Sequence, residues 1–160
     1  MKEIKKILAC VDLSEYSLIT LEYTLTLAGQ TDAKITVLNV INQRDIHAVE
    51  MAYKVYPLQQ NIDTYIKGLT QTRIQSLKQL IRDNFFDEKS KLVLRIETGI
   101  PYEVIINTAE AEDTDLIVMA NKGRSNLSRV FFGSAAEKVF RHSRVPVVSV
   151  RDKKLFKRGK

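Results

Sequence analysis

The fold is decided by the stretch Leu116-Ile117-Val118-Met119-Ala120-Asn121-Lys122-Gly123, which nine intervening residues separate from Gly133-Ser134. Its apolar run predicts a buried strand, and the basic, glycine-bearing loop after it leads into a helix. Gly123 permits a positive φ, and Gly133 lets the chain approach a ligand closely before Ser134 opens the helix. We therefore expect an anion-binding loop suited to phosphate at the carboxyl end of this strand.

Length and composition predict one domain. A chain of 160 residues with 44% hydrophobic residues can bury one core but is too short for two ordinary domains. We expect residues 1–150 to form this domain and residues 151–160 to form a basic tail. No apolar run approaches the roughly 20 residues that span a bilayer, and the N-terminus has no signal-peptide core, which predicts a cytoplasmic protein and no membrane association.

The net charge of +6 is concentrated in the tail. Residues 151–160 contain six basic residues and one acidic residue, or +5, which leaves +1 for residues 1–150. Because the domain lacks a basic face and the tail lacks interleaved aromatic residues, nucleic-acid binding is disfavoured. The single cysteine, Cys10, is expected to be a buried, inert thiol, and the two histidines, His47 and His142, have no metal cluster around them.

Strand-like and helical periodicity alternate along the chain. Strands are expected over residues 7–11, 35–41, 92–96, 116–120 and 145–150, with helices over residues 18–29, 62–84, 101–109 and 134–142. Residues 42–61 show no clear periodicity, and a connection of this length is commonly a functional lid or partly helical, so we expect one of these, mobile without ligand. The alternation predicts an α/β fold with a parallel sheet covered by helices on both faces, and such sheets bind ligands beyond the carboxyl ends of their strands.

Five segments resemble the universal stress protein family: ILACVDLSE at 7–15, VLNV at 37–40, GIP at 99–101, MA-x-x-G with the later GS at 119–134, and RVPV at 144–147. The resemblance covers essentially the whole chain. It implies a Rossmann-like fold, similar to the adenine nucleotide alpha hydrolases, with a five-stranded parallel sheet of order 3-2-1-4-5. It also implies an ATP-binding regulatory module of the stress response that forms a homodimer through the last strand, Val147–Val150.

The same resemblance implies where a nucleotide would lie. Asp12 would meet the adenosine ribose, Val40 and its neighbours would wall the adenine, and the glycine-bearing loop would hold the phosphates, with Mg²⁺ as a companion ion. Lys122 and Arg124 would add cations there. The candidate nucleotide-binding residues are Val11, Asp12, Val40, Gly99, Met119, Ala120, Lys122, Gly123, Arg124, Gly133, Ser134 and Ala135.

The first glycine of the family's phosphate motif is Ala120 in this chain. If that position requires a positive φ or direct contact with phosphate, the methyl group costs roughly 1–2 kcal/mol and weakens binding about tenfold. Structural interpretations also stand beside the functional ones: Ser134 with Glu137 has the pattern of a helix capping box, and Asp12 could cap the first helix.

Three hypotheses follow. The first is a nucleotide-responsive regulatory module, and the second is a family member that has lost its nucleotide and acts only as an interaction homodimer, as Ala120 favours. The third, a nucleotidyl-transfer enzyme, needs acidic or histidine residues at the α-phosphate that the sequence does not supply. Because no nucleophile with a base and an orienting partner can be assembled, we predict no dedicated catalytic turnover and leave slow ATP hydrolysis open.

Overall fold

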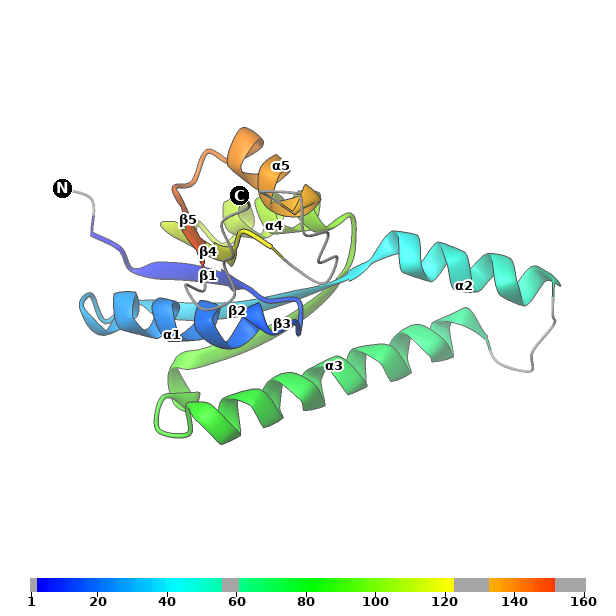
Figure 1. Cartoon of the computed structure of the whole chain (residues 1–160), viewed down its shortest axis with the longest axis horizontal. Coiled ribbons are helices and arrows are strands. Elements are labelled where there is room, and N and C mark those ends of the chain that lie inside the picture. Colours follow the sequence, from blue (N-terminus) through cyan, green and yellow to red (C-terminus); the bar gives the residue numbers. More distant parts are fainter. Residues whose placement is uncertain (1–2, 56–60, 123–132, 152–160) are drawn as a thin grey trace, which may run out of the picture.

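The computed structural model describes residues 3–55, 61–122 and 133–151, which form a five-stranded parallel sheet (Figure 1). Its order is β3-β2-β1-β4-β5, which confirms the predicted fold class and strand order. The strands are β1 (Lys6–Cys10), β2 (Lys34–Asn42), β3 (Leu92–Gly99), β4 (Leu116–Ala120) and β5 (Val147–Val150). All neighbouring strands are parallel, so their carboxyl ends share one edge.

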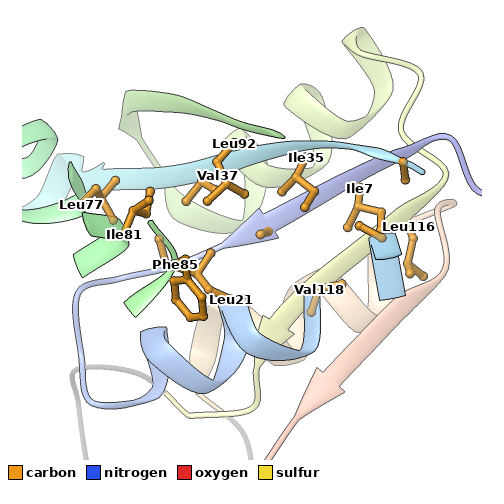
Figure 2. Packing of buried hydrophobic residues seen from close by; sticks show 14 of the residues in the cluster. Ile7, Leu21, Ile35, Val37, Leu77, Ile81, Phe85, Leu92, Leu116 and Val118 are labelled. Atoms are coloured by element: carbon orange, nitrogen blue, oxygen red, sulfur yellow. The ribbon is translucent and has the colours of Figure 1, made fainter. Parts of the chain in front are cut away.

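Helices cover both faces of the sheet, as the apolar runs predict. Alternate residues of β1 point to opposite sides: Ile7 belongs to one buried cluster and Leu8 to the other. The first cluster is covered by α1 and α3 (Figure 2), and the second by α4 and α5. The helices are α1 (Tyr16–Gly29), α2 (Gln43–Val55), α3 (Ile62–Asn84), α4 (Pro101–Ala111) and α5 (Ser134–His142), with a short 3₁₀ turn at Lys89–Lys91.

Of the two alternatives for the segment after β2, a lid or a partly helical connection, the structure shows helix, because residues 43–55 form α2. Asn42 starts this helix, with its side-chain oxygen accepting a hydrogen bond from the Arg44 amide at 3.0 Å. Only Ile46 is buried in α2, so the helix has too narrow an apolar stripe to show clear periodicity in the sequence. Residues 56–60, the rest of the expected lid, lie outside the described residues.

Helix α3 has two unlike halves. Leu77 and Ile81, in its C-terminal half, are buried against the sheet together with Phe85 (Figure 2). The N-terminal half and α2 extend past the edge where the strands end (Figure 1), and we call these two segments, residues 43–55 and 62–73, the arm. Among the described helices, none combines the length and apolar character required for crossing a membrane.

We expect Leu77→Ala to lower the free energy of unfolding by about 2–5 kcal/mol, because it removes a fully buried side chain between α3 and the sheet. Leu69→Ala, on the same helix but in the arm and only half-buried, should cost about 1 kcal/mol or less. Urea denaturation followed by circular dichroism checks both values. Equal losses for the two variants would contradict the division of α3 into an anchored half and an arm.

Candidate functional site

A cavity of about 550 Å³ opens at the carboxyl edge of the sheet, within the size range of small-molecule sites. Nine of the twelve candidate residues line it, and they come from the ends of β1, β2 and β4 and from the start of α5. The nine are Val11, Asp12, Val40, Met119, Ala120, Lys122, Gly133, Ser134 and Ala135. The structure thus brings together residues that are more than a hundred positions apart in the sequence.

Three candidates are not part of this lining. Gly123 and Arg124 lie outside the described residues. Gly99 ends β3 beside Asn42 but does not line the cavity. A Cβ atom added at Gly99 would lie 2.7 Å from Cγ2 of Val104, so the missing side chain at this position leaves room for the Val104 side chain of α4.

Asp12 shapes the turn between β1 and α1. Its Oδ1 accepts a hydrogen bond from the Ser14 amide at 3.0 Å and lies 3.5 Å from the Ser17 hydroxyl, which donates to it. Leu13, between them, has a φ of 62°, a left-handed conformation that disfavours a leucine side chain. Helix α1 begins only at Tyr16 with Glu15 as its N-cap, so Asp12 holds the turn before the helix and is not its N-cap.

The expected phosphate end is built by β4 and α5. Ala120 ends β4 in register with Val150, and its φ is not positive, so in this structure the alanine methyl group carries no left-handed strain. The Gly133 amide donates to the Asn121 carbonyl at 2.7 Å, which ties the start of α5 to the end of β4.

The capping-box interpretation of Ser134 was wrong. The N-cap of α5 is Gly133, without a side-chain capping bond, and Glu137 instead accepts a hydrogen bond from Arg141 at 2.9 Å. The first intrahelical bond runs from the Glu137 amide to the Gly133 carbonyl. The amides of residues 134–136 precede that bond and belong to residues that line the cavity, which is the arrangement that suits an anion.

Comparison with known proteins identifies the fold family. The model of the universal stress protein family matches residues 3–151. This chain belongs to the universal stress protein family.

Individual relatives agree. The chain is 28% identical over 159 residues to universal stress protein MJ0577 of Methanocaldococcus jannaschii, covering 93% of this chain and 96% of the relative. The solved structure of MJ0577 has a TM-score of 0.77 and covers 95% of this chain and 99% of that one.

Two more distant structures share the fold. UspA of Lactobacillus plantarum is 22% identical with a TM-score of 0.72, covering 94% of this chain and all of its own. A universal stress protein whose crystal structure contains cAMP is 18% identical with a TM-score of 0.60, covering 93% of this chain and 98% of its own.

Several cavity residues of this universal stress protein were missed from its sequence. Among them are Asp45 of α2 and Arg73 of α3, which reach the cavity from the arm. A signal for Arg73 was present, because it lies four residues after Leu69 and four before Leu77, on the apolar stripe of its helix. A cation on such a stripe is expected to have a partner or a ligand.

Cys10 is partly buried, not fully buried as expected, and lines the cavity among apolar neighbours; desolvation there raises the pKa of its thiol to about 12. No group of three or more His, Cys, Asp or Glu side chains suited to a metal ion occurs in the described part of the chain.

We expect the native Cys10 thiol to react with a disulfide reagent at pH 8 about 10³-fold more slowly than the unfolded thiol, because only about one thiol in 10⁴ is ionised. The unfolded thiol loses its proton above about pH 9 while the native one keeps it to about pH 12. Its contribution to stability is therefore complete below pH 9 and falls above it. Labelling in buffer and in urea checks the rate ratio, and Cys10→Ser gives the blank. Equal rates would contradict the raised pKa of the native thiol.

Proposed function

We propose that this universal stress protein is a cytoplasmic, nucleotide-responsive regulatory module that binds ATP at the carboxyl edge of its sheet. The observation that carries the proposal is that nine candidate residues, from separate parts of the sequence, line one cavity. Any single feature of a phosphate loop could occur by chance. Chance is a poor explanation for nine such residues that meet at the one sheet edge where parallel sheets bind ligands.

The phosphate end suits a polyanion. The start of α5 supplies backbone amides and the positive end of the helix dipole, and the half-buried Lys122 adds a cation. Because Ala120 is extended here, the strain that would weaken binding about tenfold is not present. The distant relative with cAMP also favours an adenine nucleotide as the ligand.

The nucleoside end combines an apolar wall with one carboxylate. Leu38, Val40 and Met119 offer surfaces against which a flat base can pack, and Asp12 offers an oxygen for ribose hydroxyls. Mg²⁺ would enter with the phosphates of ATP, because the described residues provide no cluster of metal ligands of their own. We infer that the module signals by whether its cavity holds a nucleotide, and not by turning one over.

We expect the wild-type protein to bind ATP with Mg²⁺ at micromolar concentration in calorimetric titration, and Ala135→Asp to weaken that binding at least about tenfold. The new carboxylate would lie at the phosphate end and repel the anion, while an acidic residue in the first turn does not harm the helix. Ala135→Asn is the matched control, with the same shape and no charge, and should retain most of the affinity.

Two results decide the outcome. Equal affinities for the Asp and Asn variants would place the phosphates elsewhere. An absence of heat and of any thermal shift at millimolar ATP would reject the nucleotide module and favour the family member that acts only as an interaction homodimer.

We also propose that the protein forms a homodimer through β5. In the described structure β5 is an edge strand that pairs only with β4. The Pro146 carbonyl accepts a hydrogen bond from the Ile117 amide, and the Val150 carbonyl accepts one from the Asn121 amide. Because alternate residues of a strand bond to the same neighbour, the backbone N–H and C=O groups of Val147 and Ser149 point to the open edge. An open edge of this kind is a template for a second copy.

We expect Ser149→Pro to convert a dimer into a monomer in sedimentation at micromolar concentration, because proline removes an outward N–H without breaking a bond to β4. Ser149→Ala is the control. The Ser149 hydroxyl is buried without a hydrogen-bond partner among the described residues, so its removal should leave both dimer and fold intact. A wild-type protein that sediments as a monomer would contradict the proposed interface.

A further inference from the structure

Arg73 is a charged side chain on the apolar stripe of α3. It lies four residues after Leu69 and four before Leu77, which is buried against the sheet, yet Arg73 lines the cavity. Its Nη1 lies 3.5 Å from Oδ1 of Asn39 on β2, to which it donates. Arg73 therefore belongs to the cavity and not to the solvent-exposed face of α3.

Asn39 explains how Arg73 is held there. This side chain is fully buried in the middle of an apolar strand, and its amide donates to the Val11 carbonyl at 2.8 Å. Val11 immediately precedes Asp12, so one buried amide links the β1 turn with the guanidinium on α3. Buried polar side chains with satisfied bonds fix geometry, and this one places Arg73 next to the nucleoside half of the cavity.

The strand order separates Arg73 from the phosphate end. Lys122 and the start of α5 follow β4, whereas Arg73 lies over β2, and β1 with Asp12 runs between them. A nucleotide with its ribose at Asp12 and its phosphates at α5 would direct its base toward β2. Arg73 would then meet the base and not the phosphates.

Asp45 completes this side of the cavity. It lies in the first turn of α2, directly after β2, and lines the cavity with Asn42. A carboxylate accepts hydrogen bonds from an amine, and a guanidinium donates to ring nitrogens or stacks on an aromatic face. The two side chains together have the donor and acceptor character that complements the edge of adenine.

We propose that Arg73 and Asp45 form a base-recognition subsite contributed by the arm, in which Asp45 accepts a hydrogen bond from the exocyclic amine and Arg73 donates to or stacks on the ring. This inference rests on the proposed nucleotide site and deepens it. It assigns base selectivity to α2 and α3, outside the loops that hold ribose and phosphate.

The test compares ligands that differ in one group. Arg73→Gln should weaken ATP and adenosine by the same factor, about tenfold, because the lost contact is to the base that both share. Arg73→Lys should not restore binding, since a lysine has no planar fork to stack or to donate two bonds. Arg82→Gln, an exposed site on the same helix, is the matched control and should bind both ligands as wild type does.

Asp45 is tested with purine riboside, which is adenosine without the exocyclic amine. Asp45→Asn should weaken adenosine several-fold and leave purine riboside unchanged, because only adenosine has the amine that the carboxylate accepts from. Circular dichroism of each variant shows whether the fold is retained.

The outcomes separate this inference from the proposed function. If wild type binds ATP and Arg73→Gln weakens ATP but not adenosine, Arg73 lies at the phosphates. If Arg73→Gln and Asp45→Asn both bind as wild type does, neither residue recognises the base. Either result overturns the subsite while the nucleotide module stands. Failure of wild type to bind ATP and adenosine overturns both.

Discussion

The all-parallel pairing of the sheet is the constraint on which the rest of the structure depends. Because every strand runs in the same direction, β1, β2 and β4 end at one edge, and the chain must turn into a helix after each of them. Those turns bring the α5 backbone amides, the Asp12 carboxylate and the Lys122 cation into one cavity, although they are far apart in the sequence. The buried bond from Asn39 to the Val11 carbonyl fixes two of these strand ends relative to each other.

The part of the fold that could be predicted from sequence is the part with a strong apolar period. The four-residue run in β4 and the long stripe of α3 gave the strand and the helix bounds Ile62–Asn84 directly, since burial on a sheet requires that spacing. Helix α2 was foreseen only as one of two alternatives for its segment, because it buries a single residue, Ile46, and its start is marked only by the Asn42 side chain. Weak burial leaves a helix with little sequence signal.

The candidate site divides in the same way. Residues at the ends of strands, just beyond them and at the start of α5 were predictable, because parallel sheets place ligands at that edge, and nine of them line the cavity. Arg73 was not predicted. Its place on the apolar stripe of α3 was a signal, but helical spacing alone indicates packing, and the contact of Arg73 with Asn39 exists only in three dimensions. The capping box at Ser134 failed for a further reason: the sequence matches the pattern, but the helix already starts at Ser134, one residue earlier than a serine cap requires, so Gly133 is the N-cap.

The two halves of α3 connect these observations to signalling. The C-terminal half is anchored by Leu77 and Ile81 in the core, while the N-terminal half extends beyond the sheet beside α2, with little buried surface to hold it. A ligand moves such an element only if it binds one arrangement better than another. Contacts of the ligand with the sheet are the same in both arrangements of the arm, because the sheet is closely packed, so they provide no difference in affinity. The proposed contacts of the base with Asp45 and Arg73 can provide it, since these residues begin α2 and end the arm segment of α3. Occupancy of the cavity would then be transmitted through the two helices whose own packing resists it least.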